Sequence, residues 1–234
     1  PQDLRDALVG PDGLTLRWYV EALTAPEFTR GMLVSLILGL IAATLANLFG
    51  LLASLAIVRN EFPGKAAITL FIMSPLLVPS TILGLALYVF MVRLGFGSGV
   101  VPLVIGHTLL VLPFSVRLLT ASLQNFDRSM EEAAYNSGAG PVRTVFSVTL
   151  PIIRPGLTAS FVMCFIISWN DFALSIFLAS SDWIPLPIQI YTYIKFQYDA
   201  VSAAVVSTVI FLSAAMIVAL DRLVGLQAVL GGRR

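Results

Sequence analysis

The sequence predicts an all-α, polytopic helical membrane protein, and three observations lead to this prediction. Of the 234 residues, 58% are hydrophobic and 12% are charged, against about 25% charged residues in an average soluble domain. Five apolar segments each reach the roughly 20 residues that a helix needs to cross a bilayer core. None of them alternates polar and apolar residues as a membrane β-barrel strand does. The composition argues against a soluble domain, and a net charge of +1 gives no electrostatic basis for binding nucleic acid.

The predicted spans follow one another with short connections. In order, they are Gly31–Val58, Ala66–Val92, Val100–Leu123, Leu157–Ala179 and Ala200–Leu220. Pro75 and Pro79 interrupt the second span, where neighbouring helices can accommodate a kink. We expect His107 in the third span to bond a neighbouring helix, and we expect four glycines to allow close helix packing: Gly39, Gly50, Gly84 and Gly106.

Basic residues set the predicted orientation, because cytoplasmic loops are enriched in Lys and Arg. They concentrate at the ends that follow spans one, three and five: Arg59, Lys65, Arg128, Arg143, Arg154, Arg222, Arg233 and Arg234. Residues 1–30 would then lie outside, 31–223 would form the membrane domain, and 224–234 would be a cytoplasmic tail. An external N-terminal segment needs a preceding span, so we expect a sixth helix upstream of Pro1.

The cytoplasmic loop 124–156 is the longest polar connection between spans. Ser129 to Glu132 has the pattern of a capping box at the start of a short helix. Gly138 is a natural helix stop, and Pro141 suits the first turn of a second short helix, which we expect to end before Leu150. An ordinary amphipathic hairpin is one interpretation of this loop, and a docking site for another protein is the other.

The same loop resembles the EAA loop of ABC importer permeases. That pattern is Glu-Ala-Ala, three residues, Gly, nine residues, Ile, one residue, Leu-Pro. This sequence matches it at Glu132, Ala133, Ala134, Gly138, Leu150 and Pro151, with Val148 in place of Ile. The resemblance implies the type I ABC importer permease fold in a bacterial inner membrane, with the loop docked on a separate ATPase.

The resemblance also implies the partners. They are a second, homologous permease subunit, two copies of a cytoplasmic ATPase subunit and an external substrate-binding protein. This chain has no Gly-rich phosphate loop followed by Lys and Ser or Thr, so ATP and Mg²⁺ are expected on the ATPase. We expect no cofactor, metal site or enzymatic activity on this chain, because it has one histidine and one cysteine.

Asp171 is the most costly residue to place in a bilayer, because charges inside spans are rare and usually face a cavity or a partner. Trp169, Asn170, Asp171 and Phe172 are therefore the candidate translocation-pathway residues. The alternative is that Asp171 caps a helix break. The two interpretations are compatible, since broken helices often build transport sites.

Two segments, Gly13–Tyr19 and Trp169–Phe172, resemble the spermidine/putrescine permease branch. This resemblance implies a small polar solute, with a polyamine as the best expectation. The alternatives are a secondary transporter or channel, which predicts internal repeats and several intramembrane ionisable groups, and an intramembrane enzyme. The transporter or channel leaves the cytoplasmic loop unexplained, and the missing catalytic set argues against the enzyme.

Overall fold

A computed structural model of the chain describes residues 17–196 and 200–224. The helices are α2 (Arg17–Thr24), α3 (Pro26–Arg59), α4 (Lys65–Met73), η1 (Ser74–Leu77), α5 (Ser80–Arg93), α6 (Val100–Gln124), α7 (Ser129–Asn136), α8 (Pro141–Thr144), η2 (Val145–Thr149), α9 (Leu150–Asn170), α10 (Ser175–Leu178), α11 (Leu186–Phe196) and α12 (Ala200–Val224). Apart from its first residue, Val224, the predicted tail 224–234 lies outside the described residues.

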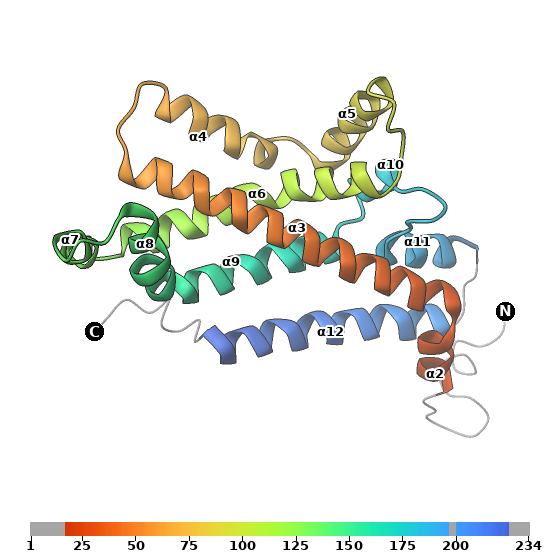
Figure 1. The fold of residues 1–234 in the computed structure, drawn as a ribbon. Helices are drawn as coiled ribbons and strands as arrows, with labels where there is room; N and C mark the ends of the chain where they lie inside the picture. The colour runs from red at the N-terminus through yellow and green to blue at the C-terminus, as the bar shows by residue number, and fades with distance from the viewer. Residues whose placement is uncertain (1–16, 197–199, 225–234) are drawn as a thin grey trace.

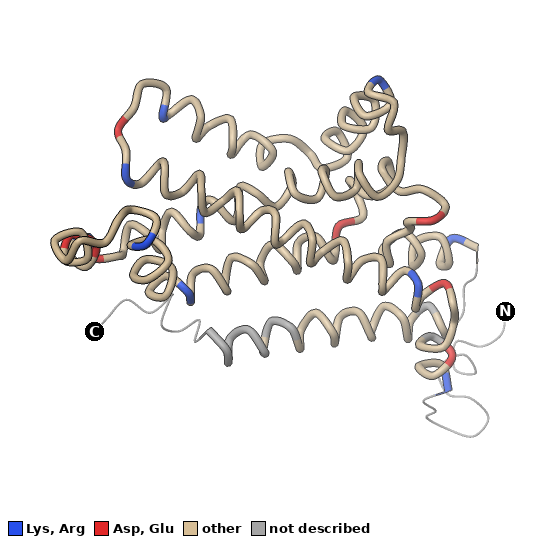
Figure 2. Tube along the Cα trace, in the orientation of Figure 1, with Lys and Arg blue, Asp and Glu red and all other residues tan. Residues whose placement is uncertain are grey.

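Three long helices, α3, α6 and α9, pack against one another at the centre of the molecule (Figure 1). Helix α12 lies along α9 and also contacts α2, while α10 contacts α5 and α6. The α7–α8 hairpin, which comprises α7, the turn after it and α8, lies at one end of the long helices (Figure 1). Charged residues gather at the two ends of the helices, and the stretch between them is nearly free of charge (Figure 2).

Three of the five predicted spans, the first, third and fourth, correspond to long apolar helices in the structure. Among the described residues, three helices are long and apolar enough to cross a membrane: Pro26–Arg59, Val100–Gln124 and Pro141–Asn170. The fifth segment corresponds to α12, which contains the apolar stretch Ala203–Ala215.

The second segment departs from a simple span. Helices Lys65–Leu77 and Ser80–Arg93 meet at an angle of 107°. Pro79 precedes α5 with an extended backbone, ψ 132°, which fits the bias of proline against a helix interior. The two prolines therefore produce a sharp bend, which is larger than the kink that the sequence predicted.

Close helix contacts occur at all four glycines that were expected to provide them. A Cβ on Gly84 would lie 2.9 Å from the backbone Cα of Leu174, and one on Gly50 would lie 2.3 Å from Ser115 Oγ. Gly39 meets the ring of Phe165 and Gly106 meets leucine side chains at similarly short distances. The glycines thus allow approaches that an added methyl group would block.

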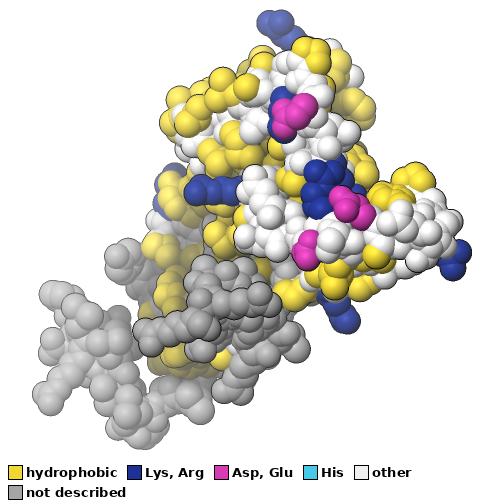
Figure 3. All heavy atoms as spheres, turned by 90° about the vertical axis from the view of Figure 1, so that its left-hand side faces the viewer, with side chains coloured by type: hydrophobic (Ala, Val, Ile, Leu, Met, Phe, Trp, Pro, Cys, Tyr) yellow, Lys and Arg dark blue, Asp and Glu magenta, His cyan; other side chains and the backbone are white. Residues whose placement is uncertain are grey.

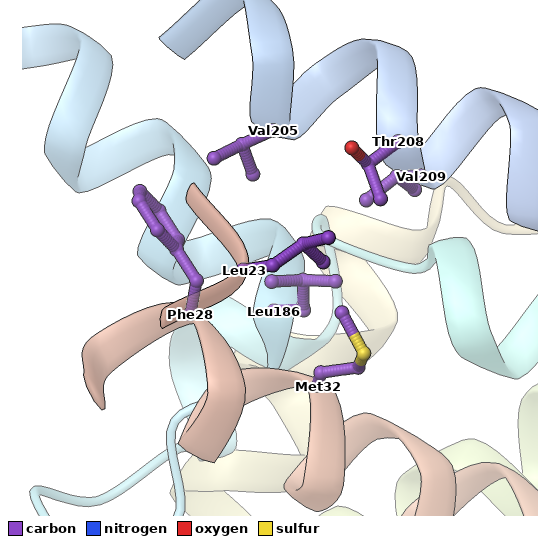
Figure 4. A pocket seen from close by; sticks show the side chains of 7 residues that line it. All are labelled: Leu23, Phe28, Met32, Leu186, Val205, Thr208 and Val209. Atoms are coloured by element: carbon purple, nitrogen blue, oxygen red, sulfur yellow. The ribbon is translucent and has the colours of Figure 1, made fainter. Parts of the chain in front are cut away.

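A small apolar pocket lies where α2, α3, α11 and α12 meet (Figure 4). Its free volume is about 10 Å³, close to the minimum that one water molecule needs. It is lined by Leu23, Phe28, Met32, Leu186, Val205, Thr208 and Val209. The pocket is a packing gap and does not hold a solute.

The arrangement of the two ends predicts which residues can be labelled from outside. Ser98 and Ser181 lie in the α5–α6 and α10–α11 connections, and Asn136 ends α7. Single cysteines at positions 98 and 181 should react with a membrane-impermeant maleimide in intact cells, whereas a cysteine at position 136 should react only after lysis. Native Cys164 is fully buried and provides a low background. Labelling of position 136 from outside would invert the orientation.

Candidate functional site: the α7–α8 hairpin and the α9–α10 break

The reversal between α7 and α8 depends on Gly138. Its backbone has φ +84°, a left-handed conformation that glycine adopts at little cost. The Gly138 N–H donates to the Tyr135 carbonyl at 2.9 Å, and the Ala139 N–H donates to the Ala134 carbonyl at 3.0 Å. This is the Schellman pattern of helix termination. The predicted stop at Gly138 and the predicted start at Pro141 are both confirmed.

The predicted capping box is wrong. Ser129 lies inside α7 and makes no side-chain cap, and the residue at the cap position is Arg128. Instead, Asp127 Oδ1 accepts the Ser129 N–H at 3.0 Å. Aspartate often accepts a hydrogen bond from the backbone N–H two residues ahead of it. In α7 this bond is formed at the helix start, where a serine cap was predicted. The same bond lowers the pKa of the exposed Asp127 carboxyl.

The second short helix does not end before Leu150, as the sequence predicted. Helix α8 continues through the π-helical turn η2 into α9, so that residues Pro141–Asn170 form one long helical segment. The Leu150 N–H donates to the Val145 carbonyl, five residues back. Pro151 lies in the first turn of α9, directly after the π-helical turn, and has no N–H to donate. A loop boundary at 156 therefore falls inside α9.

The residues that match the EAA pattern divide into two groups. Glu132, Ala133 and Gly138 are exposed, and Ala134 is half-buried. By contrast, Val148 and Leu150 pack against a buried cluster of Leu123, Phe126 and Ile153, while Pro151 is exposed. The first half of the pattern faces away from the helix bundle, and the second half anchors the hairpin to it.

Large apolar side chains project into the surroundings from the same hairpin and from η2, which follows it. Their exposed fractions range from 43% to 70%, and they are Met130, Tyr135, Val142 and Phe146. Figure 3 shows this end of the molecule, where hydrophobic side chains lie beside acidic and basic ones. Exposed apolar groups rimmed by polar residues are typical of an interaction surface. Sequence reasoning missed these four, although their place on α7, α8 and η2, near Ala133 and Gly138 in the sequence, could have indicated them.

A buried polar cluster joins the hairpin to α3. Arg59 Nη2 donates to Glu131 Oε1 and also, at 3.2 Å, to Thr149 Oγ1. The Thr149 hydroxyl donates to the same Glu131 oxygen. Glu131 is only 4% exposed and Thr149 is fully buried. Sequence reasoning missed this Arg59–Glu131–Thr149 cluster, since two neighbouring acids on a short helix must face different sides, and only the tertiary structure decides which one turns inward.

The predicted pathway residues surround a helix break rather than lying within a span. Helix α9 ends at Asn170, so the fourth span does not continue to Ala179. Asp171 is half-buried, and its Oδ2 accepts the backbone N–H groups of Leu174 and Ser175, each at 3.1 Å. The carboxylate thus satisfies backbone donors at the turn into α10, as the capping interpretation predicts.

The neighbours of Asp171 point in different directions. Trp169 is 2% exposed and stacks on Phe165, with 5.8 Å between ring centroids. Asn170 is exposed, and its amide donates to the Ile166 carbonyl at 2.9 Å. The ring of Phe172 packs on that of Tyr191, with 5.0 Å between the ring centroids. Within the described part of the chain, no three His, Cys, Asp or Glu side chains come together as a metal site would require.

His107 connects both sides of this break. It is fully buried on α6, with Nδ1 2.8 Å from Ser168 Oγ on α9 and Nε2 2.8 Å from Ser175 Oγ on α10. A neutral imidazole donates through one nitrogen and accepts through the other, so both serine hydroxyls are satisfied. The predicted bond from His107 to a neighbouring helix is confirmed.

Comparison with known proteins agrees with this geometry. Residues 35–228 match the family described as binding-protein-dependent transport system inner membrane component. The chain belongs to this family and is the permease subunit of an ABC importer.

Several relatives are transport permeases. The chain is 28% identical to the spermidine/putrescine transport system permease PotC of Escherichia coli K12, over 88% of this chain and 78% of that protein. It is 28% identical to the putrescine permease PotI of the same strain, over 78% of this chain and 68% of that protein. It is also 32% identical to a probable sulfate transport permease, cysT, of Nephroselmis olivacea, over 83% and 73% of the two chains.

Solved structures share the fold at low sequence identity. A chain of the inward-facing MetNI methionine ABC transporter matches with a TM-score of 0.69 and 22% identity, over 84% of this chain and 94% of that one. A chain of a bacterial ABC transporter that imports alginate matches with a TM-score of 0.72 and 14% identity, over 94% of this chain and 86% of that one. The predicted type I ABC importer permease fold is confirmed.

The His107 bonds predict a specific stability defect. His107→Phe should fill the space but leave the buried Ser168 and Ser175 hydroxyls without their ring partner, at a cost of about 1–3 kcal/mol. The thermal unfolding midpoint of the purified subunit in detergent should fall. His107→Gln, whose amide both donates and accepts, should recover part of the loss. A midpoint for His107→Phe equal to that of the wild type would contradict the role of this network.

Proposed function

We propose that this permease subunit works with a second, homologous permease subunit, two cytoplasmic ATPase subunits and an external binding protein, and that it translocates a polyamine. ATP and Mg²⁺ would bind on the ATPase subunits, which also carry out the hydrolysis. Family membership supports the importer assembly, and a matching transporter structure was solved with its substrate-bound periplasmic protein.

The exposed face of the α7–α8 hairpin, together with Phe146 of the following turn η2, is the proposed ATPase dock. It presents the small residues Ala133 and Gly138, the free-standing acid Glu132 and the apolar side chains Val142 and Phe146. A matching partner surface would be an apolar groove with a basic group near its rim. The observation that supports this proposal most strongly is the exposure of large apolar groups beside charged side chains at one end of the long helices.

Two apolar positions provide the sharpest test of the dock. Combined Val142→Asp and Phe146→Asp should reduce the amount of ATPase subunit that co-purifies with the assembled importer by about tenfold or more, because buried interface anchors contribute about 2 kcal/mol or more. Co-purified chains are quantified by mass spectrometry. Val20→Asp, at a 60% exposed position on α2, is the matched control and should retain the ATPase. Full retention by the double variant would reject the dock.

The polyamine proposal rests on the relatives and on Asp171. PotC and PotI are named for cationic solutes, whereas the cysT relative is named for an anion. Among the described hydrogen bonds of the Asp171 carboxylate, all use Oδ2, so Oδ1 can face a cation while Oδ2 caps the turn. A carboxylate in this position suits an ammonium group and disfavours sulfate.

The variant Asp171→Asn removes the negative charge of the side chain but keeps an oxygen that can cap the turn, so it distinguishes solute recognition from capping. Asparagine caps nearly as well as aspartate, so the assembled complex should form in normal amount. The KM for uptake of radiolabelled putrescine or spermidine should rise about tenfold or more. The reason is that loss of one partner from a charge pair between protein and solute costs about 2 kcal/mol or more. Asp182→Asn, an exposed acid paired with Arg30 at 3.9 Å, serves as the control and should leave uptake unchanged.

Two outcomes would contradict this assignment. Unchanged uptake kinetics in Asp171→Asn would leave Asp171 with the structural role alone. Uptake of sulfate in preference to both polyamines by the wild-type importer would reject the solute class while leaving the importer assembly intact.

A further inference from the structure

We propose that the Arg59–Glu131–Thr149 cluster positions the α7–α8 hairpin on the transmembrane helix α3, so that movement of the hairpin is transmitted to α3. Glu131 is the central positioning residue. The proposal rests on the proposed function of the hairpin as the ATPase dock, and it assigns to Glu131 a role different from that of its exposed neighbour Glu132.

The cluster connects three segments that are distant in the sequence. Arg59 is the last residue of α3, and Glu131 lies in the first turn of α7. Thr149 is the last residue of the π-helical turn η2, directly before α9. One carboxylate oxygen of Glu131 accepts from both Arg59 and Thr149. A single side chain of the hairpin therefore contacts the ends of two long helices.

Helix α7 has few other contacts with the transmembrane helices. Its main packing partners are α8 and η2, both of which lie in or next to the hairpin. Among the described side-chain hydrogen bonds, the bond from Arg59 to Glu131 is the one that joins α7 to α3. Without it, α7 would be held through η2 and its own connections, and a displacement of α7 would reach α3 only indirectly.

Stability alone does not account for an ion pair at this place. The side chains of Arg59 and Glu131 are 17% and 5% exposed, and well-packed apolar residues often stabilise a buried site as well as an ion pair does. What the ion pair adds is a fixed direction and partner, because the guanidinium group bonds in a defined plane. The cluster also includes Thr149, the last residue of the π-helical turn η2, and π-helical turns occur frequently at functional sites.

The test uses the complete importer in proteoliposomes with its binding protein and a transported polyamine. The variants are Arg59→Gln, Glu131→Gln and the two combined, and the measured quantities are bound ATPase, ATP hydrolysed and solute moved. We expect each variant to bind the ATPase and hydrolyse ATP, while solute moved per ATP falls about fivefold or more. The double variant should fall no further than the single ones, since the residues act as one unit.

A second ion pair nearby provides the matched control. Lys65 Nζ bonds Glu61 at 2.8 Å on the surface, with the Glu61 side chain 90% exposed. Glu61→Gln removes an acid next to the same end of α3, and it should leave solute moved per ATP unchanged.

The double variant decides the outcome if a single variant fails to assemble, because it leaves no unpaired buried charge. A wild-type ratio of solute to ATP in the double variant would overturn the proposal, even if fewer complexes form. Loss of the ATPase from the double variant would also overturn it, because Glu131 would then belong to the docking contact. Failure of the dock itself is detected separately, by retention of the ATPase in the Val142→Asp and Phe146→Asp variant.

Discussion

The close packing of α3 against α6 and α9 is the contact on which the other elements depend. In a bilayer the hydrophobic effect does not bring helices together, so small residues that let backbones approach one another take its place. The buried small residues along this part of α3 are Gly39, Ala42, Ala43, Ala46, Gly50 and Ser54, while Gly31 and Ser35 contact Leu186 at the start of α11. Hydroxyl groups add bonds across the same contacts, from Ser54 to the Val116 carbonyl and between Ser160 and Ser115, each at 3.1 Å.

The two polar networks lie where this packing ends or is interrupted. His107 bonds both sides of the break between α9 and α10, and Glu131 bonds the ends of α3 and η2. A polar group without a partner in an apolar environment costs several kcal/mol, so each network favours one arrangement of the elements it joins. The α9–α10 break and the α7–α8 hairpin are thereby held at opposite ends of the long helix α9.

Transport permeases named for different solutes share one scaffold with this chain. Relatives named for polyamines and for sulfate match this chain at similar identity, and structures of methionine and alginate transporters share its fold. The α9–α10 break is well suited to such variation, because a capping carboxylate needs only one oxygen for the backbone and keeps the other for a ligand. Under the proposed function, Asp171 would therefore combine a structural and a recognition role without a change of backbone.

The amino-acid sequence alone was enough to predict the helical membrane class, most of the span positions, the close contacts at Gly39, Gly50, Gly84 and Gly106, and the turn at Gly138. Each of these follows from local properties, namely the length of an apolar run, the absence of a Cβ or the freedom of glycine to adopt positive φ. The local bond of Asp127 to the Ser129 N–H could have been expected from the sequence but was not. Two further features depend on packing between distant segments: the bend of 107° at Pro79, and the inward position of Glu131 while Glu132 faces out. The last choice depends on Arg59, which lies 72 residues from Glu131 along the chain, and no pattern within a short helix contains that information.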